Sequence, residues 1–310
     1  MNSISFVIPC YRSEHTLEAV VDEIIEVSEK LNIDDYEIVL VCDSSPDNVW
    51  EVIEKLSREH SNIRGILFSK NFGQHAALLA GYAASKGDIV VSLDDDGQTP
   101  IDELNLLLNE LEKGYDVVYA YYEEIKQTAF RRFGSWMAAK MSELMLGAPK
   151  GFKGSSFYVA KRFVIEEMVK YENTYPYLAG LVLRTTHNVS NVMTHHRERQ
   201  YGTSGYSFLS LLKLWINGFI AFSVMPLRIG VFVGGLFSVF GILYAIFIII
   251  RKILNPAISA GWASTISVIL VIGGLLLAML GLVGEYVGRI YICINKSPQY
   301  VVKKKTYNRE

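Results

Sequence analysis

Three consecutive carboxylates, Asp94, Asp95 and Asp96, are the residues whose types and spacing point most directly to chemistry. They follow the apolar run Ile89–Val91, which is typical of a buried parallel strand, and ligands of open α/β sheets bind at the carboxyl ends of such strands. Side chains two residues apart in an extended chain point the same way, so Asp94 and Asp96 should lie close together. Such a pair repels unless a proton or a cation lies between its carboxylates.

A hard divalent ion is the natural partner of such a pair. Mg²⁺ and Mn²⁺ prefer oxygen ligands, and an ion held in this way usually also binds a substrate phosphate. A plain acidic turn that caps a helix explains the same segment, because Asp102 and Glu103 follow Pro100 as they would at a helix start. The three carboxylates alone leave both interpretations open.

The segments around these carboxylates alternate between strand and helix patterns. Apolar runs with strand character lie at residues 4–9, 36–41, 63–68, 89–91 and 116–121. Apolar residues at helical spacing lie between them, at residues 17–27, 49–59, 76–85 and 104–111. This order predicts an α/β fold, with a parallel sheet covered by helices and right-handed crossovers.

Several function classes lack their sequence features. The first strand is not followed by the G-x-G-x-x-G of dinucleotide-binding domains, and no Walker A loop is present. A net charge of −2 over 310 residues gives no general indication of nucleic-acid binding. Cys10, Cys42 and Cys293 have no metal-ligand spacing, so we expect free thiols in a reducing compartment. We expect no signal peptide, because no basic region precedes the short apolar stretch at the N-terminus.

Two long apolar runs occupy the last third of the chain, at Ile229–Ile250 and Thr265–Val283. Their lengths of about 22 and about 19 residues are enough for two transmembrane helices. Only Arg251 and Lys252 supply positive charge between the runs, whereas basic residues recur in the tail after the second run. The positive-inside rule therefore places both ends of the chain in the cytoplasm.

Two further segments are expected at the membrane surface. Residues 208–222 are apolar but interrupted by Lys213 and Asn217, which favours an interfacial helix over a span. Arg131 and Arg132 lie beside aromatic and Met-rich apolar residues. They suit a helix at the lipid headgroup level, or a lipid phosphate bound by charge-assisted hydrogen bonds. A solvated basic turn is the alternative.

Four segments, in this order and spacing, resemble the family 2 glycosyltransferases. They are IPCYRSEHTLE from Ile8, Cys-Asp-Ser-Ser-Pro-Asp-Asn at residues 42–48, KNFGQHAALLAGYAASKGD from Lys70 and SLDDDGQTP from Ser92. The third segment and the tail narrow the resemblance to the polyprenyl-phosphate branch: dolichol-phosphate-mannose synthase-like, bactoprenol glucosyltransferase-like and undecaprenyl-phosphate aminoarabinose transferase-like enzymes. The resemblance covers nearly the whole chain and implies a Rossmann-like nucleotide-diphospho-sugar transferase domain of the GT-A type.

The resemblance implies a nucleotide-sugar site on the loops that follow the strands. Asp94 and Asp96, with Gln98, would bind Mg²⁺ or Mn²⁺ and the donor diphosphate. Asp43 would hold the base of the nucleotide, although a place in the turn at residues 43–48 is the alternative role. The full set implied for the nucleotide sugar is Pro9, Tyr11, Glu14, Asp43, Lys70, Gly73, Asp94, Asp95, Asp96, His196, Arg199 and Ser204.

The resemblance also implies an acceptor-phosphate site at Arg131, Arg132 and Ser135, and a loop with His196, Arg199 and Ser204 that closes over the donor pyrophosphate. The catalytic residues would be Asp94, Asp96, Arg131, Ser135 and Arg199. Ser156 stands where some relatives carry Asp and Tyr158 where Arg is common. We therefore assign no general base, and departure of the nucleoside diphosphate with help from a metal would carry most of the acceleration.

Together with these patterns, the resemblance implies a membrane-anchored inverting glycosyltransferase that makes a polyprenyl-phosphate sugar. It would transfer a sugar from a nucleotide-diphosphate donor, most simply a UDP-sugar, to undecaprenyl phosphate at the cytoplasmic face of a bacterial inner membrane. Its partners would be donor, lipid acceptor and bilayer, with self-association plausible and no nucleic acid involved. The alternatives are another lipid or polysaccharide acceptor, or a non-catalytic membrane partner. The expected parts are a catalytic domain (1–205), an interfacial segment (206–228), a two-helix anchor (229–284) and a basic tail (285–310).

Overall fold

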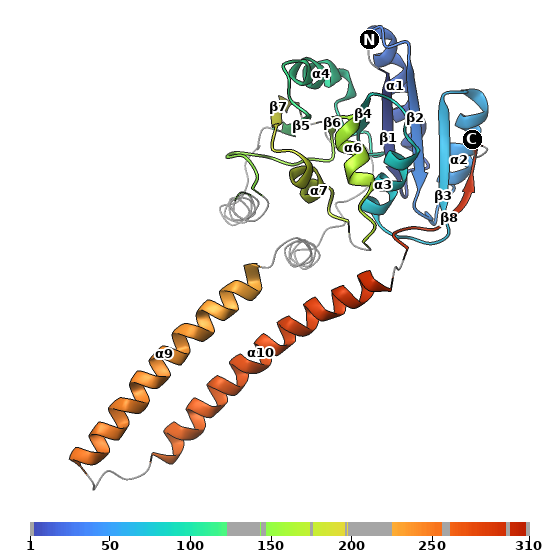
Figure 1. Cartoon of the computed structure of the whole chain (residues 1–310). Helices are drawn as coiled ribbons and strands as arrows, with labels where there is room; N and C mark the ends of the chain where they lie inside the picture. The colour runs from blue at the N-terminus through green and yellow to red at the C-terminus, as the bar shows by residue number, and fades with distance from the viewer. Residues whose placement is uncertain are drawn as a thin grey trace. The chain divides into compact units, whose positions relative to one another are not determined.

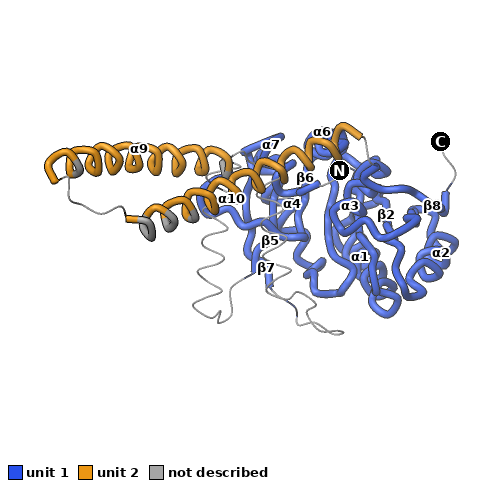
Figure 2. Tube along the Cα trace, turned by 90° about the horizontal axis from the view of Figure 1, so that it is seen from below, with its two compact units in different colours: residues 1–207, 296–310 blue, residues 208–295 orange. Residues whose placement is uncertain are grey.

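The chain forms two compact units (Figure 2). The computed structural model describes residues 3–122, 143, 147–173, 176–195, 197, 225–255, 261–295 and 298–307. The first unit comprises residues 1–207 and 296–310, and the second comprises residues 208–295. The last residues therefore belong with the first unit, whereas the sequence pattern placed them in a separate basic tail.

An eight-stranded sheet forms the centre of the first unit, in the order β7-β5-β6-β4-β1-β2-β3-β8 (Figure 1). Its strands are β1 (Ile4–Cys10), β2 (Tyr36–Cys42), β3 (Ile63–Phe68), β4 (Ile89–Ser92), β5 (Val117–Tyr122), β6 (Tyr158–Lys161), β7 (Val189–Thr194) and β8 (Val302–Lys305). Strands β3, β2, β1 and β4 are parallel, which confirms the α/β prediction for the centre. Strand β6 is antiparallel to β4 and β5, and β8 is antiparallel to β3, so the complete sheet is mixed.

Helices cover both faces of this sheet. They are α1 (Leu17–Lys30), α2 (Val49–Glu59), α3 (Gln74–Ala84), α4 (Leu104–Glu112), α6 (Arg162–Val169) and α7 (Leu178–Thr185), with a 3₁₀ turn η1 (Ile101–Glu103) before α4. The apolar sides of α1, α2 and α4 share one buried cluster with the sheet. Helix α3 packs on the opposite face with α6, which in turn contacts α7.

Alternation along β1 divides its side chains between these two layers. Phe6 and Ile8 belong to the cluster beneath α1 and α2. Val7 faces α3, where a Cβ built on Gly81 would lie 2.3 Å from Val7 Cγ1. The glycine therefore lets α3 lie close to the sheet.

Strand β8 attaches the C-terminal residues to the first unit. The N–H of Gly65 donates to Thr306 Oγ1 at 2.8 Å, and the N–H of Thr306 donates to the Gly65 carbonyl at 3.0 Å. The ring of Tyr300 stacks on Phe68 with centroids 5.1 Å apart. The amide of Gln299 donates to the carbonyl of Asn173 at 2.7 Å. The tail thus contacts both the sheet edge and the segment before α7.

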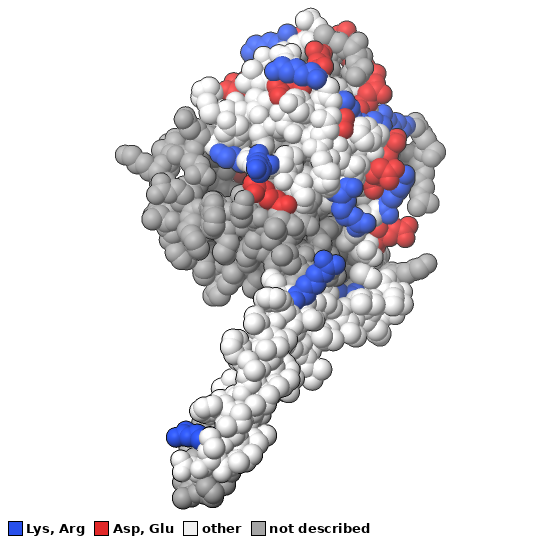
Figure 3. All heavy atoms as spheres, turned by 60° about the vertical axis from the view of Figure 1, so that its left-hand side comes forward, with Lys and Arg blue, Asp and Glu red and all other residues white. Residues whose placement is uncertain are grey.

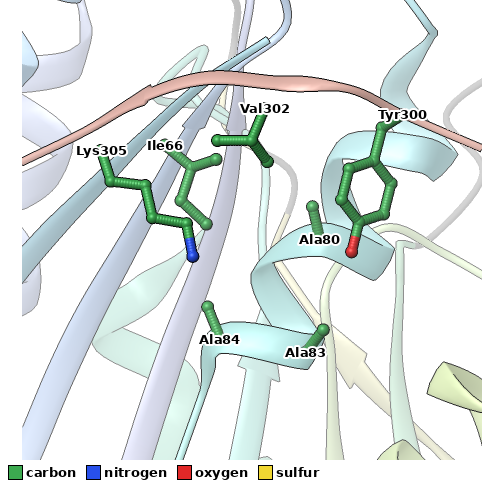
Figure 4. A pocket seen from close by; sticks show the side chains of 7 residues that line it. All are labelled: Ile66, Ala80, Ala83, Ala84, Tyr300, Val302 and Lys305. Atoms are coloured by element: carbon green, nitrogen blue, oxygen red, sulfur yellow. The ribbon is translucent and has the colours of Figure 1, made fainter. Parts of the chain in front are cut away.

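A small cleft of about 80 Å³ lies between β8 and α3 (Figure 4). Its walls include Ala80, Ala83 and Ala84 of α3, with Tyr300, Val302 and Lys305 across from them. These alanines lie toward the C-terminal end of α3, whereas the loops that carry the carboxylates meet its N-terminal end. The cleft is therefore separate from the candidate site.

The described residues of the second unit form a hairpin of two long helices, α9 (Met225–Leu254) and α10 (Trp262–Ile294). Within the described residues, Leu227–Arg251 and Val271–Ile294 are long and apolar enough to span a membrane. Most of the hairpin surface in Figure 3 carries no charged side chain.

The second candidate span lies nearer the C-terminus than the sequence pattern indicated. Helix α10 continues past Gly284, and its two charges pair one turn apart, with Arg289 Nε donating to Glu285 Oε1 at 3.0 Å. The two surface segments expected at residues 130–145 and 208–222 fall almost wholly outside the described residues.

Candidate active site

The carboxylates follow β4, between β1 and β6, where the carboxyl ends of the parallel strands meet. Oδ1 of Asp94 accepts a hydrogen bond from Gln74 Nε2 at 2.7 Å. Oδ2 of Asp94 accepts one from the hydroxyl of Ser156. Asp94 is thereby held between the first residue of α3 and the segment that enters β6.

Asp95 turns toward the loop that follows β1. Its Oδ2 accepts the N–H of Tyr11 at 2.9 Å, and its carbonyl accepts the hydroxyl of Thr16 at 2.6 Å. Burial raises the pKa of Asp95 to about 7, and the nearby charge of Asp94 acts in the same direction. Asp95 therefore joins two loops of the site.

The phenol of Tyr122 lies within electrostatic reach of both Asp94 and Asp96. Burial raises the pKa of Tyr122 to about 12, and the charges of Asp94, Asp96 and Glu103 contribute to the increase. Tyr122 is the last residue of β5, two strands away from β4 in the sheet. Gln98 lies in the same turn, and its N–H donates to Asp96 Oδ1 at 3.1 Å.

This donor set fits a hard divalent cation. Asp94 and Asp96 offer carboxylate oxygens, the ligands that Mg²⁺ and Mn²⁺ prefer. Within the part of the chain that the structure describes, no group of three or more His, Cys, Asp or Glu side chains forms a complete cage. Mg²⁺ sites that hold substrate phosphates usually have this form, with one or two carboxylates and the remaining ligands from phosphate and water.

Asp43 shapes the loop between β3 and α3. Its two carboxylate oxygens accept the N–H groups of Phe72 and Gly73, each at 2.7 Å. The side chain is buried, and burial raises its pKa although both hydrogen bonds oppose that change. Gly73 has φ +94°, a conformation that favours glycine. Asp43 therefore holds the turn that begins α3, a role that the sequence pattern did not reveal.

The other described residues of the expected nucleotide site lie on the same edge of the sheet. The N–H of Asn48 donates to Glu14 Oε2 at 2.9 Å, and the N–H of Glu14 donates to Asp47 Oδ2 at 3.0 Å, which ties the loops after β1 and β2 together. Tyr11 is exposed, and Lys70 places its ammonium 5.1 Å from the centre of the Phe72 ring. Pro9 is buried in β1.

A cavity of about 240 Å³ opens beside Asp94, since its lining includes both Gln74 and Ser156. His75, Tyr119, Tyr158 and Tyr177 form much of the remaining wall. The hydroxyl of Tyr158 forms a hydrogen bond with Tyr82 behind the wall. Among the described residues that line this cavity, none is Asp, Glu, Lys or Arg.

Comparison with known proteins identifies the family and the fold. Residues 5–169 match glycosyl transferase family 2, which is more than half of the chain. The chain belongs to glycosyltransferase family 2. Residues 225–290 of this glycosyltransferase match the GtrB C-terminal hairpin, which corresponds to the two long helices.

Named relatives extend over nearly the whole glycosyltransferase. The undecaprenyl-phosphate 4-deoxy-4-formamido-L-arabinose transferase of Proteus mirabilis is 31% identical over 307 residues, which cover 98% of this chain and 94% of the relative. The protein of the same name from Yersinia pestis is 31% identical over 308 residues, with the same coverage. The fold is shared with glucosyl-3-phosphoglycerate synthase from Mycobacterium tuberculosis, with a TM-score of 0.51 and 20% identity over 69% of this chain and 76% of that chain. The resemblance proposed from the sequence is therefore confirmed.

Six expected residues of the glycosyltransferase site lie outside the described residues: Arg131, Arg132, Ser135, His196, Arg199 and Ser204. Their neighbour Arg197 is described, and its guanidinium pairs with Glu23 at 2.8 Å and with Asp102. The N–H of His195 donates to Glu103 Oε2 at 2.9 Å. The chain after β7 is thus held against α1 and η1, next to the turn of Gln98, whose amide donates to the Arg197 carbonyl at 3.5 Å.

The structure adds Gln74, His75, Tyr122 and Tyr177 to the residues around the site. Gln74 and His75 follow Gly73, so their place at the start of a helix gave a local indication that they lie near the site. Nothing local marks Tyr122 or Tyr177, because each approaches through sheet or loop packing. Ser156, noted in the sequence only as a departure from the family, proves to be a hydrogen-bond donor to Asp94.

Proposed function

We propose that this glycosyltransferase transfers a sugar from a nucleoside-diphosphate donor, a UDP-sugar in the simplest case, to undecaprenyl phosphate. The observation that carries the proposal is the placement of Asp94, just after β4, beside a cavity of about 240 Å³ whose described lining residues include no Asp, Glu, Lys or Arg. The names of the relatives from Proteus mirabilis and Yersinia pestis support the acceptor. A structure of the same fold is a complex with Mn²⁺ and uridine-diphosphate-glucose, which supports the donor class.

A divalent cation, Mg²⁺ or Mn²⁺, would be held by Asp94 and Asp96, with Gln98 in the same turn. Such an ion neutralises negative charge on the diphosphate as it departs. Gln74 and Ser156 orient Asp94 through its two oxygens, so that its carboxylate is positioned before the substrate binds.

The reaction needs little acid–base chemistry from the chain. A phosphate oxygen of the acceptor forms a bond to the anomeric carbon of the sugar, while the bond from that carbon to the diphosphate breaks. The nucleoside diphosphate leaves with the electron pair, and the configuration inverts. Since the attacking phosphate is already ionised at neutral pH, Ser156 in place of an acid does not prevent this step.

Residues outside the described part complete the proposed site. Arg131, Arg132 and Ser135 would bind the acceptor phosphate, and His196, Arg199 and Ser204 would contact the donor pyrophosphate. Arg197, which lies between His196 and Arg199 in the sequence, pairs with Glu23 and Asp102, and its carbonyl accepts a hydrogen bond from the amide of Gln98. Arginine suits both roles because its guanidinium binds phosphate with two parallel hydrogen bonds.

The helical hairpin would hold the enzyme at a bacterial inner membrane, with the catalytic unit and both chain ends in the cytoplasm. The acceptor is a lipid, so attachment to its membrane reduces the search for it to two dimensions. The distribution of basic residues supports this orientation. In this proposal the catalytic unit includes residues 296–310 as well as the N-terminal segment.

The test is transfer of label from a panel of UDP- and GDP-sugars to undecaprenyl phosphate by the full chain in detergent or vesicles. We expect one donor to give a labelled lipid. Release of free nucleotide with no lipid product would indicate a different acceptor. Absence of transfer, nucleotide release and nucleotide binding across the panel would contradict the proposal and favour a non-catalytic membrane partner.

A further inference from the structure

His75 occupies a fixed position in the wall of the cavity beside Asp94. It is the second residue of α3. The centroid of its ring lies 6.2 Å from that of Tyr177, and both residues line the cavity. Its Nδ1 lies 2.9 Å from the carbonyl oxygen of Pro176. The side chain is therefore held from two directions, by its own helix and by the segment that enters α7.

The contact with Pro176 determines which ring nitrogen carries hydrogen. A carbonyl oxygen only accepts, so Nδ1 must donate. Burial lowers the pKa of His75, which favours the neutral ring. In a neutral imidazole whose Nδ1 carries the hydrogen, Nε2 has a lone pair and accepts hydrogen bonds.

The rest of the cavity has the properties of a site for one uncharged sugar ring. Tyr119, Tyr158 and Tyr177 supply aromatic surface, and Ser155 and Ser156 supply hydroxyl groups. Small-ligand sites combine such apolar walls with a few polar groups that determine orientation.

We propose that His75 is a specificity-determining residue of the transfer reaction: its Nε2 accepts a hydrogen bond from a hydroxyl or amide N–H of the transferred sugar. The carbonyl of Pro176 is the positioning group, because it keeps the hydrogen on Nδ1 and the lone pair on Nε2. This inference rests on the proposed function, since it assumes that the cavity receives the donor sugar. Donors that lack a hydrogen-bond donor at the contacted position leave Nε2 unpaired and bind more weakly.

Three substitutions distinguish the roles of the two ring nitrogens of His75, Nδ1 and Nε2. His75→Ala removes both, and His75→Asn keeps an N–H near the position of Nδ1 but no acceptor at Nε2. His75→Gln places a carbonyl oxygen near the position of Nε2, and so keeps an acceptor for the sugar. His60→Ala is the matched control, because His60 lies between α2 and the amino end of β3, whereas the site lies at the carboxyl ends of the strands.

The experiment compares KM for the transferred UDP-sugar with the inhibition constant of UDP, using the full chain with undecaprenyl phosphate and Mn²⁺. The loss of one hydrogen bond raises KM by about tenfold for His75→Ala and His75→Asn. We expect KM to return toward the wild-type value in His75→Gln. The inhibition constant of UDP should stay within about twofold of wild type in all three His75 variants and in His60→Ala. The ranking of UDP-glucose, UDP-galactose and UDP-N-acetylglucosamine should change in His75→Ala.

An unchanged UDP constant also shows that each variant is folded, so a loss of sugar discrimination is not a loss of structure. The inference is overturned if His75→Ala keeps the wild-type donor ranking, or if the UDP constant rises in parallel with KM. Wild-type enzyme that binds no UDP and transfers no sugar would instead overturn the proposed function, and this inference with it.

Discussion

The amide of Gln74 donates a hydrogen bond to Oδ1 of Asp94 at 2.7 Å, which joins the start of α3 to the end of β4. Gln74→Leu removes this bond and should lower kcat/KM by about tenfold, corresponding to about 1.4 kcal/mol. Gln74→Glu places an additional negative charge beside Asp94 and should lower kcat/KM further. Steady-state kinetics with a metal titration measures kcat/KM of both variants. Wild-type kinetics in Gln74→Glu would show that this contact does not orient Asp94.

Asp43 supports the same end of α3 from the other side. Asp43→Ala leaves the N–H groups of Phe72 and Gly73 without their acceptor, and should reduce the free energy of unfolding by about 2–4 kcal/mol. Urea unfolding of the detergent-solubilised chain, followed by tryptophan fluorescence, measures this loss. Asp34→Ala is the control at an exposed carboxylate and should change stability by less than about 0.5 kcal/mol. Equal effects of the two substitutions would contradict the role of Asp43.

Asp95 should make the stability of the metal-free protein depend on pH. Since burial raises its pKa to about 7, the folded chain holds this proton more tightly than the unfolded chain. The contribution of Asp95 is therefore greatest at low pH and falls as the pH rises from about 4 toward 7. Asp95→Asn removes the titration and should raise Tm relative to wild type more at pH 8 than at pH 5. The same difference in Tm at both pH values would contradict this assignment.

Tyr300 tests whether the tail is part of the catalytic unit. Tyr300→Ala removes its stacking on Phe68 and should reduce the free energy of unfolding by about 1–3 kcal/mol. Lys303→Ala changes an exposed neighbour in β8 and serves as the control. Thermal unfolding of both variants gives the comparison. If Tyr300→Ala unfolds at the wild-type temperature, β8 does not stabilise the first unit.

The centre of the fold follows from local patterns. Strands β1–β4 lie within one residue of their expected bounds, because buried parallel strands are continuous apolar runs between turns. The position of Asp94 and Asp96 follows from the same rule, since ligands bind at the carboxyl ends of such strands. Strands β6 and β8 were not among the runs with strand character in the sequence. Strand β8, Val302–Lys305, is mostly lysine, and it pairs through its backbone with the free edge of β3.

The details of the site depend on contacts between distant segments. The residue types of Gln74 and Ser156 do not indicate that both bind Asp94, because their approach depends on how α3 and β6 pack around β4. The inward turn of Asp95 toward Tyr11 is similarly a property of two neighbouring loops. Asp43 was expected to contact the nucleotide, and the structure shows that both its oxygens already accept backbone N–H groups. Its contact with a nucleotide stays a prediction.

The most direct test of the account is formation of labelled lipid from undecaprenyl phosphate by wild type, Asp94→Asn and Asp96→Asn, with Mg²⁺, Mn²⁺ or EDTA. We predict a lipid product only with metal, and a rate reduced by at least about 100-fold in each variant, since each removes a charged ligand near the departing diphosphate. Asp34→Asn should match wild type. Lipid formed at the wild-type rate in EDTA, or by either carboxylate variant, would contradict the assignment of this site.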